Sequence, residues 1–111
     1  MNVAVLLSER DMTRRVNEHL EVLGCTITGQ NEASLVILDD LEQVHPFLSR
    51  GKYVIYFIWN DHVLAPDWLP LSANQLIRFR VFEIIPTRIL PGLREMRQYI
   101  RHLQANLPSY P

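Results

Sequence analysis

Three short, almost wholly apolar segments restrict the fold of this chain more than any other feature of its sequence. They are residues 2–7 (NVAVLL), 34–38 (SLVIL) and 53–59 (YVIYFIW). Continuous apolar runs of this length, rich in β-branched and aromatic residues, are typical of strands that are covered on both faces. Strands of this kind form parallel sheets with a layer of helices on each side. The three runs therefore predict an α/β fold.

Two apolar stripes at helical spacing predict the main helices. The first stripe spans residues 12–23; Ser8 and Asp11 have the spacing of a capping box before it, and Gly24 is placed to end the helix. The last helix is expected over residues 90–103, where one stripe is formed by Leu93, Met96, Ile100 and Leu103.

The remaining segments are shorter or less regular. We expect a brief strand over residues 25–28 and a short helix over residues 41–48, which Pro46 limits to a turn or two. Residues 77–85 alternate between apolar and charged side chains in their first half, which is typical of a strand at the edge of a sheet. Residues 60–76 follow no regular pattern.

The order of these elements predicts a three-layer α/β sandwich with a mainly parallel, five-stranded sheet. Between the second and third strands only about five residues intervene, too few for a crossover helix. Either this link is a loop over the end of the sheet, or the short strand pairs antiparallel. We expect residues 1–104 to form a single domain and residues 105–111 to be a tail or linker.

Composition narrows the class of protein. The 111 residues are 48% hydrophobic and 21% charged with a net charge of −1, unlike a disordered chain or a dedicated nucleic-acid binder. The apolar runs are too short to span a membrane, and the N-terminal residues lack the pattern of a signal peptide. Because Cys25 is the single cysteine, no internal disulfide can form, and we expect a cytoplasmic protein.

The chain resembles the receiver domain of two-component response regulators. Its first 24 residues match the first strand and helix of that family, down to the Leu-Gly of LEVLG. SLVILD matches the third receiver strand and places Asp39 at the position of the phosphoacceptor aspartate. YVIYFIW corresponds to the fourth strand, and EIIP stands where the family has Lys-Pro before its last helix. The resemblance implies a flavodoxin-like fold with a shortened or missing second helix, and a role in bacterial signal transduction or transcription regulation.

The residues that receiver chemistry needs around the acceptor are replaced in this chain. Leu7 and Ser8 stand where the family has two acids that hold Mg²⁺, Ile85 replaces the lysine, and residues 58–59 lack the switch hydroxyl. Without the metal and the lysine, a phosphoryl group in transit would lose several kcal/mol of charge stabilisation. We therefore expect a pseudo-receiver in which Asp39 is a vestigial acceptor, with no cofactor and no Mg-dependent phosphorylation.

Other candidate residues have ordinary structural explanations. Asp40 is placed to cap the helix that follows it, and Cys25, with no paired His or Asn, is expected to be a buried structural cysteine. The histidines show no metal-ligand spacing, so we expect no metal site. Asp61 and His62, after the fourth strand, are the one pair placed where an α/β site would lie.

A fainter resemblance links SERD and the helix ending in LEVLG to the opening of TIR domains. The segment DWLPLSANQL has no acid at the place of the TIR catalytic glutamate. This resemblance therefore implies an adaptor and not an NAD-cleaving enzyme.

Basic residues concentrate near the C-terminus, where residues 77–103 contain six arginines and two glutamates. We expect a non-catalytic regulatory module that acts by protein–protein interaction or homodimerisation through this region, without direct contact to nucleic acid or membrane. The expected interface consists of Arg78, Arg80, Arg94, Arg97 and Arg101 together with Trp68 and Tyr99.

Two alternative functions remain open at this point. One is an atypical receiver that is phosphorylated at Asp39 with the help of a displaced acid such as Glu9. The other is a small-ligand sensor at the strand ends near Asp39, Asn60 and Asp61, which requires a concave polar pocket there.

Overall fold

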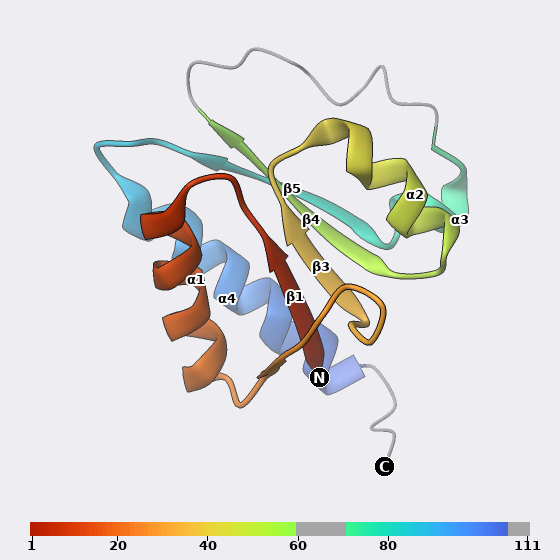
Figure 1. The fold of residues 1–111 in the computed structure, drawn as a ribbon, viewed down its shortest axis with the longest axis horizontal. Coiled ribbons are helices and arrows are strands. Elements are labelled where there is room, and N and C mark those ends of the chain that lie inside the picture. Colours follow the sequence, from red (N-terminus) through yellow and green to blue (C-terminus); the bar gives the residue numbers. More distant parts are fainter. Residues whose placement is uncertain (60–70, 107–111) are drawn as a thin grey trace.

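Across the residues that the structure describes, 1–59 and 71–106, five parallel strands form one sheet with helices on both faces (Figure 1). The structure is a computed structural model. The strands are β1 (Asn2–Leu6), β2 (Thr26–Ile27), β3 (Leu35–Leu38), β4 (Tyr53–Trp59) and β5 (Phe79–Ile84). The helical segments are α1 (Arg10–Val22), the 3-10 turn η1 (Leu41–Gln43), α2 (Val44–Ser49), α3 (Ala73–Leu76) and α4 (Ile89–Asn106).

The strand order is β2-β1-β3-β4-β5, and every neighbouring pair is parallel. This order is that of flavodoxin-like folds, so the predicted α/β sandwich is confirmed and is compatible with receiver topology. The pairing of β2 with β1 is parallel, which excludes the antiparallel alternative. β5 lies at one edge of the sheet, as its alternating charges predicted.

The link between β2 and β3 is a loop that contains no helix, as its length predicted. Residues 28–34 run back over β1, where the Ser34 N–H donates to the carbonyl of Asn2 at 3.0 Å. Ala33 is buried against the sheet, and its carbonyl accepts a hydrogen bond from Lys52 Nζ at 2.6 Å. These contacts hold the loop in the place where a crossover helix would otherwise pack.

One face of the sheet is covered by α1 and α4, which lie side by side (Figure 1). Their inward side chains are the predicted stripes: Met12, Val16 and Leu20 on α1, and Leu93, Met96, Ile100 and Leu103 on α4. Gly92 lets α4 approach β5 closely. A Cβ atom at this position would lie 2.8 Å from Ile84 Cδ1 and 3.1 Å from the carbonyl oxygen of Glu83.

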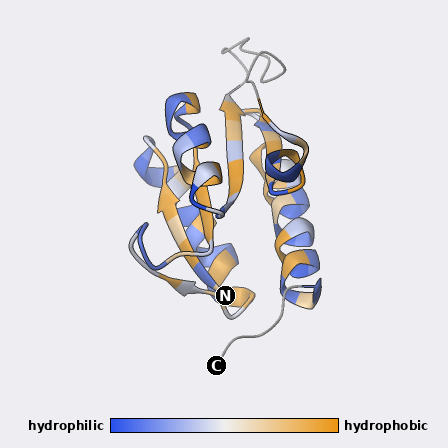
Figure 2. Ribbon diagram, turned by 90° about the vertical axis from the view of Figure 1, so that its right-hand side faces the viewer, coloured by the Kyte–Doolittle hydropathy of each residue, from blue (hydrophilic) through white to orange (hydrophobic). Residues whose placement is uncertain are grey.

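The opposite face is covered by η1 and α2, whose buried residues are Leu41, Val44, Phe47 and Leu48. These side chains pack on Val36 and Leu38 of β3 and on Val54 and Tyr56 of β4. In Figure 2 the strands are mostly hydrophobic, whereas the helices also carry hydrophilic residues. The two cores together explain the continuous apolar runs from which the sheet was predicted. None of the described helices is long and apolar enough to cross a membrane.

The predicted start of α1 was wrong in detail. Ser8 and Asp11 do not form a capping box; instead, Glu9 is the N-cap residue. Its carboxylate accepts hydrogen bonds from the backbone N–H groups of Asp11 at 3.1 Å and Met12 at 2.8 Å. Ser8 is unavailable as a cap because its hydroxyl donates to Asp39, 31 residues away.

Several boundaries also differ from the prediction. The edge strand begins at Phe79, two residues later than expected, because Ile77 and Arg78 form the turn after α3. Helix α3 itself was not predicted, although Ser72 and Gln75 form a capping box at its start. Helix α4 continues to Asn106, beyond the expected end of its apolar stripe.

Candidate functional site

Asp39, which was predicted to be a vestigial acceptor, is held by Ser8 at the carboxyl end of β3. Its Oδ2 atom accepts hydrogen bonds from the Ser8 backbone N–H at 3.0 Å and from Ser8 Oγ at 2.6 Å. The two bonds fasten the end of β3 to the segment between β1 and α1. Asp39 therefore satisfies two donors of Ser8 at a strand end.

The acids next to Asp39 in the fold and in the sequence act as helix caps. Glu9 uses its carboxylate for the first amides of α1, and Asp40 Oδ1 accepts from the N–H of Glu42 at 3.1 Å, so the predicted cap is confirmed. No group of three or more His, Cys, Asp or Glu within residues 1–59 and 71–106 is arranged to hold a metal ion. The Glu9 carboxylate, the displaced acid of the phosphorylation alternative, is engaged by two backbone N–H groups of α1. Asn60, Asp61 and His62 lie outside the described residues.

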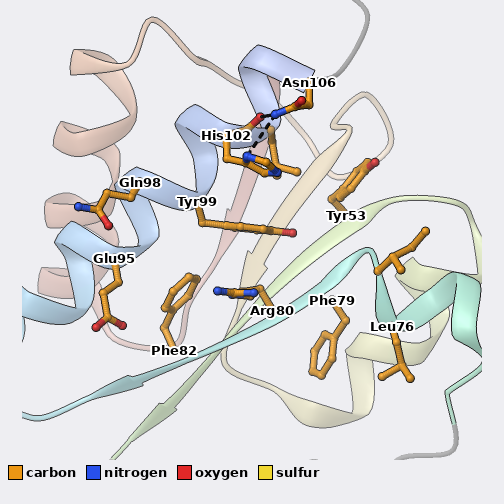
Figure 3. Close-up of a pocket in the computed structure, with 12 residues that line it drawn as sticks. Tyr53, Leu76, Phe79, Arg80, Phe82, Glu95, Gln98, Tyr99, His102 and Asn106 are labelled. Atoms are coloured by element: carbon orange, nitrogen blue, oxygen red, sulfur yellow. Dashed lines mark hydrogen bonds between the residues drawn. The ribbon is translucent and has the colours of Figure 1, made fainter.

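A hollow of about 870 Å³ lies at the edge of the sheet formed by β5, between β5 and α4 (Figure 3). Its aromatic rings come from Tyr53 on β4, Phe82 on β5 and Tyr99 on α4, whereas Phe79, which also lines it, directs its side chain to the opposite face of the sheet. The end of α3 contributes Leu76 and Ile77, and α4 contributes polar residues along the opposite side. The hollow therefore combines apolar walls with polar groups at the edge of the sheet.

Arg80 and Tyr99 form the central contact of the hollow (Figure 3). The guanidinium carbon of Arg80 lies 5.3 Å from the centroid of the Tyr99 ring, and that ring is tilted by 57° against Phe82 at 6.1 Å. Burial raises the pKa of the Tyr99 hydroxyl, although Arg80 acts in the opposite direction. Tyr99 is consequently neutral near pH 7, and its hydroxyl can donate a hydrogen bond.

The positive charge of Arg80 is not neutralised by a carboxylate of the described part of the chain. The ion pairs found there all lie on α1, between Arg14 or Arg15 and the acids Asp11 and Glu18. Glu83 follows Arg80 on β5, but its side chain points to the opposite face of the sheet because its register partner is Ile58 and that of Arg80 is Ile55. Arg80 is exposed and remains available to an external anion.

The apolar end of the hollow is unusually exposed. Leu76 is 56% exposed and Ile77 is 73% exposed, although both are large aliphatic residues. Isolated exposed aliphatic residues are common, but two adjacent ones beside an aromatic hollow form a coherent apolar surface. We call Leu76, Ile77, Arg80 and Tyr99 the edge surface.

The predicted interface residues do not form one surface. Arg80 and Tyr99 meet in the hollow, whereas Arg78 turns toward α2 and donates from NH2 to the carbonyl of Leu48 at 3.0 Å. Arg78 therefore stabilises the fold at this point. Trp68 lies outside the described residues.

The three arginines of α4 lie away from the hollow. Arg97 contacts His19 on α1, with 3.4 Å between Arg97 NH1 and His19 Nδ1. Arg94 and Arg101 are exposed on α4 and are not among the residues that line the hollow. The structure thus separates an aromatic edge surface from a cationic surface beside α1.

Cys25 has the environment of a structural cysteine. It is half-buried beside the core under α1 and α4, and Gln104 Nε2 lies 3.5 Å from its sulfur atom. Burial raises the pKa of the thiol, so the reactive thiolate is disfavoured.

Of the residues that line the hollow, only Arg80 and Tyr99 were among the predicted interface residues. Tyr53 belongs to a continuous apolar run that predicts burial, but it is partly accessible because β5 begins opposite the second residue of β4. The available signal was the combination of an edge strand with an aromatic residue at the start of its neighbour. Comparison of the sequence with models of known protein families and with curated proteins finds no match.

Proposed function

We propose that this chain is a non-catalytic, receiver-like regulatory module that binds another protein chain through the edge surface. It would act in the cytoplasm as part of a bacterial signalling or transcription regulator. The observation that carries the proposal is the position of the hollow at the sheet edge, where exposed aliphatic residues, aromatic rings and an arginine without a carboxylate partner lie together.

The energetics of this surface favour a bound partner. Burial of an aliphatic side chain the size of Leu76 or Ile77 contributes about 1.5–3 kcal/mol when it goes from full exposure to full burial. Tyrosine and arginine are enriched among residues that dominate binding energy, because each combines a large contact area with a polar group. Arg80 stacked on Tyr99 supplies both in one place.

The strand ends, in contrast, support a structural interpretation of the acidic residues. Asp39 is bonded to Ser8, and Glu9 and Asp40 cap helices. A phosphoacceptor needs its carboxylate beside a metal site, and here the neighbouring acid is used by backbone amides. These contacts favour a role in binding over phosphoryl transfer.

Site-specific photo-cross-linking in cells tests the proposal. The photoreactive residue p-benzoylphenylalanine would replace Ile77 in one variant and Val22 in a control; these residues are 73% and 68% exposed, respectively. Val22 ends α1 and does not line the hollow. We expect a protein adduct from the Ile77 position that disappears when Arg80→Glu is added. Equal adducts at both positions, or no adduct at Ile77, would contradict the proposal.

A further inference from the structure

We infer that the partner docks as an extended peptide segment that pairs with the free edge of β5, places an apolar side chain in the hollow and presents a carboxylate to Arg80. This inference rests on the proposed function and specifies the conformation and chemistry of the partner. Three independent features of the edge surface lead to it.

The first feature is the backbone of β5. The N–H of Val54 bonds to the carbonyl of Arg78 at 2.8 Å, and the parallel register continues from Val54–Phe79 onward. In a parallel ladder alternate residues bond to the neighbour, so Phe79, Val81 and Glu83 direct their N–H and C=O groups away from β4. No described segment pairs with this outer edge. An added strand would satisfy these groups, which a docked helix could not do.

The second feature is the position of the hollow beside that edge. Arg80 and Phe82 point to the α4 side of the sheet, and the hollow extends from them to the side chains of α4. In an added strand, every second side chain would point to the same side. The volume of the hollow, about 870 Å³, lies within the range of roughly 300–1,000 Å³ that is typical of ligand pockets. The hollow therefore has room for a large apolar side chain of the added strand.

The third feature is charge. Arg80 projects over Tyr99 and has no carboxylate partner in the described residues, while the neutral Tyr99 hydroxyl is a second donor. His102, on the same side of α4, is engaged by Asn106, with 3.1 Å between Asn106 Nδ2 and His102 Nδ1. Glu95 is an acid in the lining. A peptide carboxylate is favoured beside Arg80 and disfavoured beside Glu95.

A second copy of the chain satisfies these features less well. Two β5 strands that paired across a two-fold axis would complete each other's backbone bonds. However, Glu83 points to the opposite face from Arg80, so the partner copy's β5 would offer no carboxylate to Arg80. An acidic, extended segment of another protein supplies both the backbone groups and the anion.

The test uses a phage-displayed library of random linear peptides selected against the full chain. Enriched peptides would be synthesised, and their affinities would be measured by fluorescence anisotropy. We expect an apolar and an acidic residue two positions apart, so that both side chains point to the α4 side, and binding weakened at least about tenfold by Arg80→Glu. Arg50→Glu is the matched control, because Arg50 also stacks on a ring, 5.7 Å from the Phe47 centroid, but lies outside the hollow. Affinity should not change in this variant.

Backbone N-methylation of the selected peptide distinguishes strand addition from other modes of binding. We expect methylation of alternate amides to abolish binding and methylation of the intervening amides to be tolerated. Absence of enriched peptides, tolerance of methylation at every position, or equal affinity for the Arg80→Glu variant would overturn the inference. An adduct at Ile77 without enriched peptides would leave the proposed function standing and remove only strand addition. An Ile77 adduct that consists of two copies of this chain would also overturn the inference that the partner is a segment of another protein.

Discussion

The close approach of α4 to β5 at Gly92 gives a quantitative test of the structure around the hollow. Gly92 is buried, and an alanine Cβ there would meet Ile84 Cδ1 at 2.8 Å and the Glu83 carbonyl at 3.1 Å. The first distance is shorter than real Cβ contacts allow, and Ile84 is fully buried. We predict that Gly92→Ala destabilises the protein.

Two opposing effects set the size of this change. Alanine is favoured over glycine in a helix interior by about 1 kcal/mol. Overpacking of a buried site typically costs about 1–3 kcal/mol. Taking about 2 kcal/mol for the clash leaves a net loss of about 1 kcal/mol, which corresponds to a decrease in Tm of about 4 °C for a domain of this size. Helix propensity alone would make Gly92→Ala stabilising; the predicted loss of stability comes from the contact with Ile84 and Glu83.

Urea unfolding of four variants measures these contributions to stability. The variants are Gly92→Ala, Ile84→Val, the combination of the two, and Gly29→Ala. Ile84→Val removes Cδ1, so Gly92→Ala should cost about 1 kcal/mol less in that background than in the original chain. Gly29→Ala is the control, because nothing lies within 4 Å of its Cβ position and the glycine has no positive φ. It should change the free energy of unfolding by less than about 0.5 kcal/mol. A Gly92→Ala variant that is more stable than the original chain would refute the reasoning.

Three further predictions concern the strand ends and the surface between α1 and α4. Ser8→Ala removes the 2.6 Å bond to Asp39 and should lower the free energy of unfolding by about 1–2 kcal/mol in urea titrations; an unchanged midpoint would contradict this role. Incubation with a small phosphodonor and Mg²⁺ should leave the intact mass unchanged, and an adduct that Asp39→Asn abolishes would restore the receiver alternative. Burial, and to a smaller extent Arg97, lowers the pKa of His19 below its ordinary value of 6.5, so the folded state resists its protonation. This contribution to stability is present above pH 6.5 and is lost as the pH falls, so His19→Gln should lose less stability between pH 7 and pH 5 than the original chain does.

The sheet and its two covering helices could be predicted from the sequence because burial dictates their patterns. Val36, Ile37 and Val54, Ile55 lie on interior strands and are fully buried, which requires a continuous apolar run. On α1 and α4 only one stripe is buried, which requires helical spacing. These patterns arise from local periodicity, which one sequence displays without any knowledge of neighbours.

Features that depend on contacts between distant segments were less accessible. Ser8 and Glu9 are both plausible caps, and Glu9 takes the role because Asp39 engages Ser8 from another strand. The interface prediction grouped arginines by their position in the sequence, but Arg78 and Arg97 bond to other parts of the fold. Residues of the hollow, such as Tyr53, were assigned to the core because sequence patterns do not show where a neighbouring strand begins.

Hydrogen exchange of the β5 amides, followed by NMR, tests the central claim most directly. In the free chain, Arg80, Phe82 and Ile84 donate to β4 and should exchange slowly, whereas Phe79, Val81 and Glu83 should exchange faster. In complex with the protein captured at Ile77, or with the selected peptide, the second set should become protected while the first set changes little. Unchanged exchange of Phe79, Val81 and Glu83 in a saturated complex would contradict binding at the edge surface.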